Sequence, residues 1–252
     1  MQNDLLEPGE PGAAVVVNPR APSPFVLIGD HAGRRVPRRL ADLGLDDPEL
    51  DRHIGWDIGI AALGHALART LDAVFVCQNY SRLVVDCNRA PDAVDAIPEI
   101  SDGTVIPGNA ALDAAARAVR VAAIHTPYHA AIAAEIARRT AAGQATALVA
   151  LHSFTPAMRG AARSWQCGIL HDGANDALAR ALLAGLRAEP GLVVGDNEPY
   201  AMNGIDYTIP RHAFAAGLPY AEVEVRQDLL ADAAGVAGWA ARLARLLPAA
   251  LG

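Results

Sequence analysis

The chain has 252 residues, of which 52% are apolar and 19% are charged. These fractions support a sizeable hydrophobic core and exclude an intrinsically disordered chain. The formal net charge is −7, and both signs are scattered along the sequence without a basic stripe, which argues against a nucleic-acid-binding protein.

The N-terminal part of the chain begins with a segment that lacks a periodic pattern. Residues 1–24 contain five prolines, and we predict a loosely attached lead-in there, with a short edge strand at 14–18. From residue 25 onward, apolar runs and helical spacing replace this pattern. We predict a buried strand at 25–29, a turn or helix start at 36–37 and a helix at 58–71. Two further strands are expected at 73–78 and 83–86.

The rest of the chain continues this alternation after a long connection. Residues 90–109 are rich in Pro, Asp and Gly, and a loop of that length in a compact domain is often functional. A helical stretch follows at 112–139, where Pro127 predicts a kink or a break near Thr126. Strands are expected at 146–151, 166–170, 192–195 and 220–226, and helices at 174–188 and 232–247.

Strands and helices therefore alternate along the whole chain. This order predicts an α/β fold, a three-layer sandwich in which helices cover both faces of a mostly parallel or mixed central sheet. The sequence contains no internal repeat and no linker. We expect a single domain at residues 25–252, preceded by the lead-in at 1–24.

The cysteines and the apolar runs bear on the location of the protein. Cys77, Cys87 and Cys167 are odd in number and form no CxxC motif, and we interpret them as reduced thiols in the cytoplasm. No run of about 18 or more purely apolar residues is present, and the N-terminus lacks the pattern of a signal peptide. We expect no membrane partner, and the sequence does not predict the oligomeric state.

Two histidines follow apolar strands at the point where ligand sites form in open α/β sheets. His31 comes two residues after the strand at 25–29, and His152 ends the strand at 146–151. Ligands bind at the carboxyl ends of such strands, so the two imidazoles are candidates for one metal site. Zinc binds imidazole well, and a catalytic zinc ion has three protein ligands and one open position. Either histidine alone is as consistent with a structural role.

The third metal ligand is predicted less directly. The zinc-peptidase spacing His-x-x-Glu fails, because Arg34 stands where the glutamate would be. Asp57 is our choice, although an aspartate before a helix is equally typical of an N-cap. Asp30 is the reserve candidate.

Glu224 is the candidate catalytic base. It lies in the predicted strand 220–226, where a carboxylate among apolar residues is costly unless it is paired or faces a cleft. A zinc hydrolase needs such a base to take a proton from water and pass it to the leaving nitrogen. The alternation of Glu222, Glu224 and Arg226 fits a solvent-facing edge strand just as well.

A dense polar cluster suggests where a substrate carboxylate binds. Arg82, Asp86, Asn88 and Arg89 surround one predicted strand and its exit. An arginine grips a carboxylate with two hydrogen bonds, although an internal Arg–Asp pair would also explain part of the cluster. Further candidates for substrate binding are Asn197, Tyr200, Arg211 and Arg226.

Other catalytic chemistries find no support in the sequence. No serine lies in a Gly-x-Ser-x-Gly motif, which argues against an α/β-hydrolase triad. No Gly-x-Gly-x-x-Gly motif follows a strand. The chain contains no lysine, which excludes a Schiff-base mechanism.

Taken together and in this order, the motifs resemble those of the N-formylglutamate amidohydrolase family. The resemblance runs from about residue 25 to the end of the chain. It is carried by DHAG at 30–33, HIGWDIG at 53–59, SRLVVDCNR at 81–89, PYH at 127–129, LHS at 151–153, GDNEPY at 195–200 and EVEVRQD at 222–228.

This resemblance implies a phosphorylase/hydrolase-like fold, similar to zinc carboxypeptidases and aspartoacylases. By the same likeness, His31 and His152 match the metal-binding histidines and Glu224 matches the catalytic glutamate. Asn88 and Arg89 look like the pair that holds a substrate carboxylate, and Arg82 or Arg89 would also stabilise the oxyanion. The relatives in fold carry the His-x-x-Glu motif, and this chain departs from them because it lacks the glutamate.

The implied reaction is zinc-dependent hydrolysis of a small N-acyl amino acid, with N-formyl-L-glutamate giving formate and L-glutamate. The better-known histidine-degrading members have His-Ser-Gly where this chain has His31-Ala-Gly33, so the sequence looks like a divergent branch. An acetyl or succinyl substrate is one alternative. A metal-free protein that binds small acids on the same scaffold is another.

Overall fold

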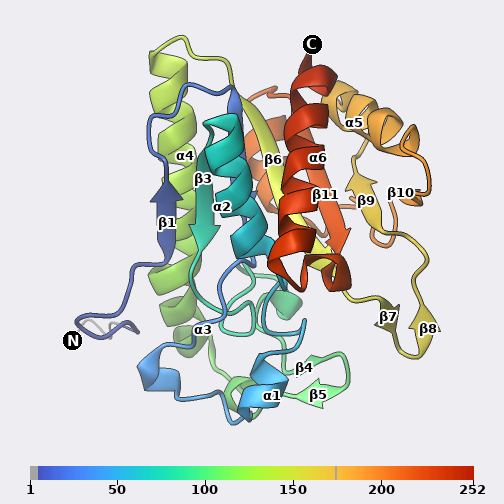
Figure 1. Ribbon diagram of the computed structural model, residues 1–252. Helices are drawn as coiled ribbons and strands as arrows, with labels where there is room; N and C mark the ends of the chain where they lie inside the picture. The colour runs from blue at the N-terminus through green and yellow to red at the C-terminus, as the bar shows by residue number, and fades with distance from the viewer. Residues whose placement is uncertain (1–4, 174) are drawn as a thin grey trace.

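A seven-stranded mixed sheet forms the centre of the molecule in the computed structural model, which describes residues 5–173 and 175–252 (Figure 1). The strand order is β1-β3-β2-β6-β11-β9-β10. The four central strands β3, β2, β6 and β11 run parallel. At the edges, β1 pairs antiparallel with β3, and β9 pairs antiparallel with β11 but parallel with β10. The strands are β1 Ala14–Val17, β2 Phe25–Gly29, β3 Val74–Gln78, β6 Ala147–Phe154, β9 Cys167–Leu170, β10 Val194–Asp196 and β11 Tyr220–Arg226.

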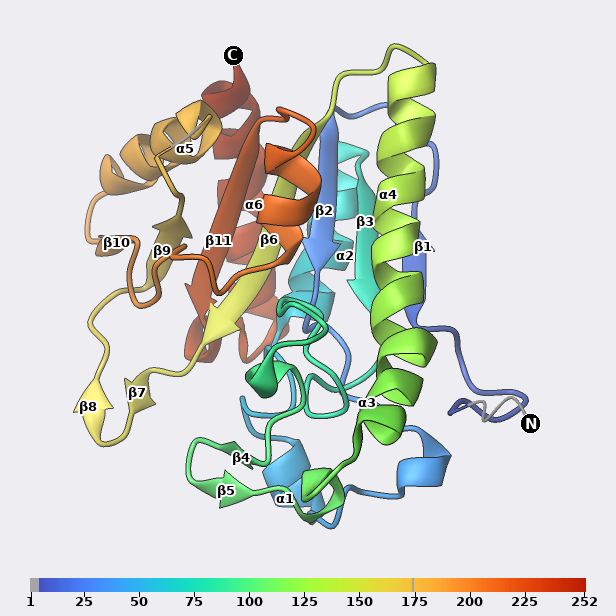
Figure 2. The ribbon, with the colours of Figure 1, turned by 180° about the vertical axis from the view of Figure 1, so that it is seen from behind.

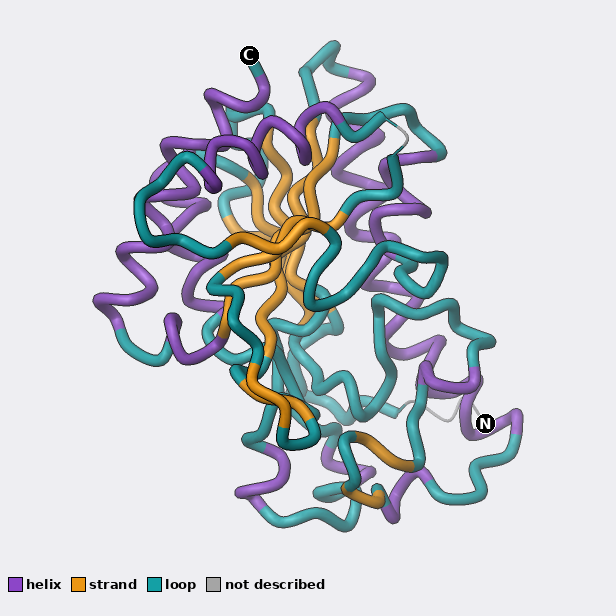
Figure 3. The backbone as a smooth tube through the Cα atoms, turned by 90° about the vertical axis from the view of Figure 1, so that its right-hand side faces the viewer, coloured by secondary structure: helices purple, strands orange, loops and turns teal. Residues whose placement is uncertain are grey.

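Helices cover both faces of this sheet, which confirms the predicted three-layer α/β sandwich (Figures 1 and 2). Helices α2, α5 and α6 lie on one face, and α4, continued by α3, lies on the other; the tube in Figure 3 shows the twisted sheet between them. The helices are α1 Asp47–Leu50, α2 Ile60–Leu71, α3 Ala114–Arg120, α4 Thr126–Ala141, α5 Ala177–Arg187 and α6 Ala233–Leu251.

Each central strand contributes alternate residues to two separate hydrophobic cores. In β6, Val149 and Leu151 pack with α2, α5 and α6, whereas Leu148 and Ala150 pack with Tyr128 and Ile132 of α4. Because successive strand residues point to opposite faces, a strand covered on both sides reads as a continuous apolar run. The site described below lies on the α4 side of the sheet, since His152 shares the face of Leu148 and Ala150.

The predicted break in the long helical stretch is confirmed, and its form is visible. The π-helical segment Val121–His125 separates α3 from α4. Pro127 lies in the first turn of α4, where its missing N–H costs no hydrogen bond. The chain therefore changes helical pitch just before the proline and continues in nearly the same direction (Figure 2).

The predicted strand at 83–86 is wrong. These residues form turns, in which Val84 N donates to Ser81 O and Arg89 N donates to Asp86 O. Leu83 and Val85 are nevertheless fully buried, because they pack beneath the loop that follows. Burial under a loop and burial in a sheet give the same apolar run, so the sequence alone could not separate them.

The long loop at 90–109 contains local structure. It carries the hairpin of β4 Ile100–Ser101 and β5 Thr104–Val105, and the side chain of Asn109 donates to the carbonyl oxygens of Leu83 and Pro98. A second hairpin, β7 Ala157–Met158 with β8 Ala161–Ala162, follows β6. Both hairpins lie at the edge of the molecule toward which the parallel strands point (Figure 1).

The predicted edge strand at 14–18 is confirmed as β1, which pairs with β3. In the described part of the lead-in, Leu5, Ala13 and Ala21 are buried. Its first four residues lie outside the described part of the chain, as does the first residue of the helix predicted at 174–188, and the division at residue 25 remains a prediction. Among the residues that the structure describes, no helix is both long enough and apolar enough to cross a membrane.

Gly64 gives a test of how α2 packs on the sheet. A Cβ added at Gly64 would overlap the ring of Phe75, which is fully buried in β3. We expect Gly64→Ala to destabilise the fold by about 1–3 kcal/mol, because overpacking forces a rigid ring to move. Gly238→Ala in α6 is the matched control, since nothing lies near its added methyl group and helix propensity favours alanine by up to about 1 kcal/mol. Urea unfolding would measure both, and equal stabilities of the two variants would contradict the packing.

Candidate metal centre

A cleft of about 590 Å³ opens where the central parallel strands end. Residues from the ends of β2, β6 and β11 line it together with both hairpins and the loop after β10. This is the edge of an open α/β sheet at which ligand sites form. The predicted metal ligands and the predicted base all belong to the lining.

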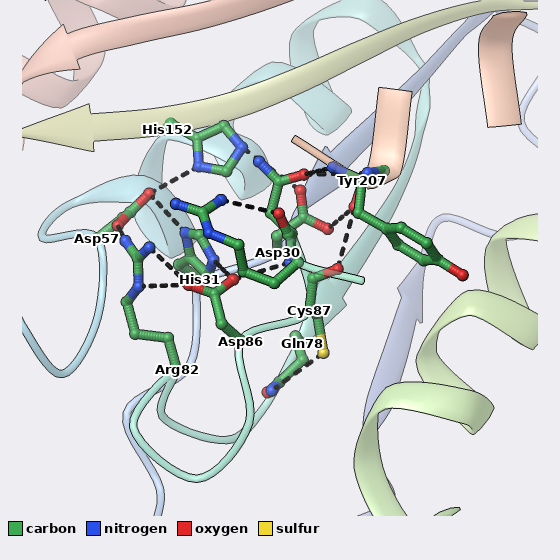
Figure 4. A network of polar contacts seen from close by, with 12 residues as sticks. Asp30, His31, Asp57, Gln78, Arg82, Asp86, Cys87, His152 and Tyr207 are labelled. Atoms are coloured by element: carbon green, nitrogen blue, oxygen red, sulfur yellow. Dashed lines mark hydrogen bonds and ion pairs between the residues drawn. The ribbon is translucent and has the colours of Figure 1, made fainter. Parts of the chain in front are cut away.

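Three of these side chains come together as the sequence predicted. His31, Asp57 and His152 are all buried, and each offers one ligand atom within 4.8 Å of those of the other two. Asp57 Oδ2 lies 2.9 Å from His152 Nδ1 and 3.4 Å from His31 Nδ1. Figure 4 shows the two rings and the carboxylate gathered in one network.

Backbone contacts place Asp57 between the two histidines. Its N–H donates to the carbonyl oxygen of His31 over 2.9 Å, which ties the segment before α2 to the end of β2. The alternative interpretation of Asp57 as a helix cap is wrong, because α2 has Gly59 as its N-cap and no side chain caps it. The Asp57 carboxylate is thus directed into the cleft.

Each imidazole is held from its far side by a second carboxylate. His31 Nε2 lies 2.7 Å from Asp86 Oδ1, and His152 Nε2 lies 3.4 Å from Asp30 Oδ2. The His31–Asp86 contact is a hydrogen bond of the kind that orients ligating histidines in metal sites, whereas His152 Nε2 and Asp30 Oδ2 form no hydrogen bond with any described residue. Asp30, the reserve candidate, therefore lies behind His152, where Thr208 Oγ1 donates to it over 2.7 Å.

The polar atoms of this group fit a divalent cation. His31 Nδ1 is buried and has no hydrogen-bond partner among the described residues, although it faces Asp57. Burial opposes the charged form of His152, yet Asp30 and Asp57 raise its pKa well above the usual value. The space between the three side chains therefore favours a positive charge. Two imidazoles and one carboxylate form a donor set that zinc accepts.

Arg82 joins the carboxylates of this network. Its Nη2 and Nε donate to Asp86 Oδ2 over 2.6 and 3.0 Å, and its Nη1 lies 3.4 Å from Asp57 Oδ1. Although burial works against ionisation, the Arg82 guanidinium holds the pKa of Asp86 well below its usual range. Arg82 lines the cleft as predicted, but three of its five N–H donors are directed to Asp57 and Asp86.

Glu224 lies beside this group through the sheet register. It pairs with His152 across β11 and β6, so the two side chains share one face of the sheet. The carboxylate is 5% exposed, its Oε2 has no hydrogen-bond partner in the described chain, and burial raises its pKa to about 7. The solvent-facing alternative is wrong for Glu222 and Glu224, because β11 lies inside the sheet between β6 and β9.

The predicted substrate-binding residues divide into two groups. Arg82, Asn88, Arg89 and Tyr200 line the cleft. The amide of Asn88 is bonded inside the protein, since its Nδ2 donates to Asp206 and its Oδ1 accepts from the backbone N–H groups of Tyr207 and Thr208. The guanidinium group of Arg89 lies at the cleft, and its Nε donates a hydrogen bond to Asp95.

Asn197, Arg211 and Arg226 are not brought to the lining of the cleft. The Asn197 side chain accepts from the backbone N–H of His171 and closes the turn after β10. Arg211 Nη1 donates to the hydroxyl of Tyr207 at the surface. Arg226 forms an ion pair with Asp228 just beyond β11, and its Nη1 donates to the carbonyl oxygen of Trp165.

Sequence reasoning missed four acidic residues that line the cleft, which are Asp95, Asp102, Asp206 and Glu222. Glu222 precedes Glu224 by two residues, and in a strand two such residues lie on the same face. The sequence did not show whether this face is covered or exposed. Asp206 comes from an irregular loop that carries no pattern. Only the fold brings this loop to the strands.

Asp86 allows a test of how His31 is held. Replacing it as Asp86→Asn removes the carboxylate that faces His31 Nε2, and we expect zinc affinity to fall by about 10–100-fold, as for other oriented histidine ligands. A zinc titration with a competing chelator would measure the zinc affinity of the variant and of the wild type. Asp102→Asn is the control, since Asp102 also lines the cleft but pairs with Arg52. Equal affinities in both variants would rule out this role of Asp86.

The chain is similar to known proteins over most of its length. A family model described as N-formylglutamate amidohydrolase matches residues 23–231. The crystal structure of gene product Atu2144 from Agrobacterium tumefaciens is 38% identical, covers 98% of both chains and has a TM-score of 0.94. That of N-formylglutamate amidohydrolase from Ralstonia eutropha JMP134 is 21% identical, covers 96% of this chain and 98% of the other, and has a TM-score of 0.67. The search of curated proteins gave no match.

Proposed function

The chain belongs to the N-formylglutamate amidohydrolase family, and from this premise we propose that it hydrolyses the amide bond of a small N-acyl amino acid with the help of a bound zinc ion. The observation that carries the proposal is the convergence of His31, Asp57 and His152 beside Glu224. These residues come from four separate segments of the chain. A structural role does not require two imidazoles and two carboxylates to face one buried space.

His31, Asp57 and His152 would hold the metal ion, and Asp86 and Asp30 would orient the two imidazoles. When bound, the ion supplies Lewis acidity toward the substrate carbonyl and lowers the pKa of water. Glu224 then acts as the general base, taking a proton from the attacking water and passing it to the departing nitrogen. A pKa near 7 suits a group that accepts and returns a proton around neutrality. One water is consumed, and the products are a carboxylic acid and an amine.

Arg89 is our candidate for the group that binds charge on the substrate. Its Nε forms a 3.0 Å hydrogen bond with Asp95, whose side chain is largely exposed. Exposed ion pairs contribute little stability, so a substrate carboxylate or oxyanion can replace Asp95 at low cost. Tyr200, which also lines the cleft, provides an aromatic surface beside it.

N-formyl-L-glutamate, which would yield formate and L-glutamate, is the reference substrate that the family suggests. N-acetyl and N-succinyl amino acids are the alternatives. Hydrolysis of a panel of N-acyl amino acids, each with one acyl group and one side chain varied, tests the proposal directly. No hydrolysis of any member by zinc-loaded protein, or a protein that binds no metal, would favour a binding protein for small acids.

The cellular setting follows from the same proposal. We propose a cytoplasmic enzyme that acts on a small molecule and has no membrane or nucleic-acid partner. The three cysteines support this location, because all are free and buried and need no oxidising compartment.

A further inference from the structure

Glu222 is a buried carboxylate of the cleft that the proposed mechanism does not use. It lies two residues before Glu224 on the same face of β11 and is 2% exposed. Its neighbours in register are Ala150 of β6 and Leu170 of β9, so neither residue directly opposite it on the sheet is charged. Its Oε2 has no hydrogen-bond partner in the described part of the protein. Burying an oxygen without a hydrogen-bond partner costs free energy, which suggests that a ligand supplies the missing partner.

A second carboxylate shares this part of the cleft. Asp206 lies in the loop after β10, where its Oδ1 accepts from Asn88 Nδ2 over 3.0 Å. The nearest guanidinium atom, Arg89 Nη1, lies 4.0 Å away. Burial and the charge of Asp206 raise the pKa of Glu222 well above its usual value. Burial and Asp206 thus disfavour the charged form of Glu222, and a cation placed between the two carboxylates would favour it.

The cations of the cleft do not compensate for these carboxylates. Seven Asp and Glu residues line the cleft but only three arginines. Arg82 is held by Asp86 and Arg89 by Asp95. Arg159, at the tip of the β7–β8 hairpin, is exposed. The cleft lining thus carries more acidic than basic side chains, and a second substrate carboxylate placed beside Glu222 and Asp206 would be repelled.

We propose that Glu222 and Asp206 form a subsite for a cation, so that the preferred substrates are N-acyl amino acids whose side chain ends in an ammonium or guanidinium group. The inference rests on the proposed function and names the amino-acid part of its substrate. Two residues along a strand span about 7 Å, so a side chain of several bonds would reach Glu222 from an amide bond held beside Glu224. The α-carboxylate of the same substrate would bind Arg89.

The test compares N-formyl-L-lysine with N-formyl-L-glutamine and N-formyl-L-glutamate, using zinc-loaded wild-type protein. We expect kcat/KM for the lysine compound to exceed that for the glutamate compound by about tenfold or more, because a buried charge rejects a like charge strongly. In Glu222→Gln this ratio should fall about tenfold, mainly through KM. Asp92→Asn is the matched control, since it removes the same charge from an exposed residue outside the cleft and should leave the ratio unchanged.

The outcomes separate this inference from the proposed function. Hydrolysis that favours the glutamate compound, with a ratio unaffected by Glu222→Gln, would overturn the cation subsite and leave the amidohydrolase intact. Absence of hydrolysis for all three compounds and for the acyl panel would overturn both. Should Glu222→Gln not fold, Asp206→Asn makes the same comparison, and an unchanged ratio in a folded Asp206→Asn variant would also overturn the subsite.

Discussion

Glu224→Gln is expected to lower kcat by about 10²–10⁴-fold while leaving zinc bound, because a positioned general base contributes that much to proton transfer. The substitution keeps the size of the side chain and removes only its ability to accept a proton. Glu224 lies beside His152 in register but is not among the three side chains that converge as ligands. The measurement is steady-state kinetics on the best substrate of the panel, together with the zinc content of the purified variant.

Two further variants make this result specific. Glu224→Asp retains the carboxylate but withdraws it by one methylene, and we expect activity between those of Glu224→Gln and the wild type. Glu99→Gln changes an exposed glutamate outside the cleft and should have wild-type kcat. Near-wild-type turnover in Glu224→Gln would show that another group takes the proton.

His152→Ala is expected to abolish both metal binding and turnover. It removes one of the three converging side chains and leaves Asp30 and Asp57 buried without the imidazole between them. Because a metal that binds only the folded state stabilises it, a chelator should lower the activity and the Tm of the wild type, and added zinc should restore both. The variant should respond to neither treatment. Zinc content and thermal unfolding with and without chelator would measure these effects.

The matched control for this experiment is His65→Ala. His65 lies on the exposed side of α2, so its loss should leave the zinc content and the response to chelator unchanged. A His152→Ala protein that keeps one zinc ion and most of its activity would exclude His152 as a ligand. A wild type whose activity survives removal of all metal would exclude metal-dependent hydrolysis.

Several parts of the site could be predicted because strand patterns fix where a chain leaves the sheet. The apolar runs before His31 and His152 are β2 and β6, and parallel strands bring their carboxyl ends to one edge. Asp57 was chosen as the third ligand without a spacing rule, and its contact with these histidines depends on a backbone hydrogen bond from Asp57 to His31. No periodicity in the sequence encodes that bond.

Other parts could not be predicted, since one pattern fitted two environments. The alternation of Glu222, Glu224 and Arg226 is the same in an exposed edge strand and in a strand that lines a cleft. The apolar residues 83–85 are buried under a loop and do not form a strand. Arg226 shares the pattern of Glu224 but pairs with Asp228 and does not line the cleft.

The sequence by itself determined the alternation of strands and helices, the positions of two histidines after buried strands, and the motif order of the family. These features are local, since they follow from burial period and turn chemistry within short segments. The tertiary structure alone decided that β11 lies between β6 and β9, which places Glu224 beside His152 and encloses Glu222 with Asp206. Such contacts join residues far apart in the chain, and they depend on the packing of whole strands and loops, which no short segment specifies.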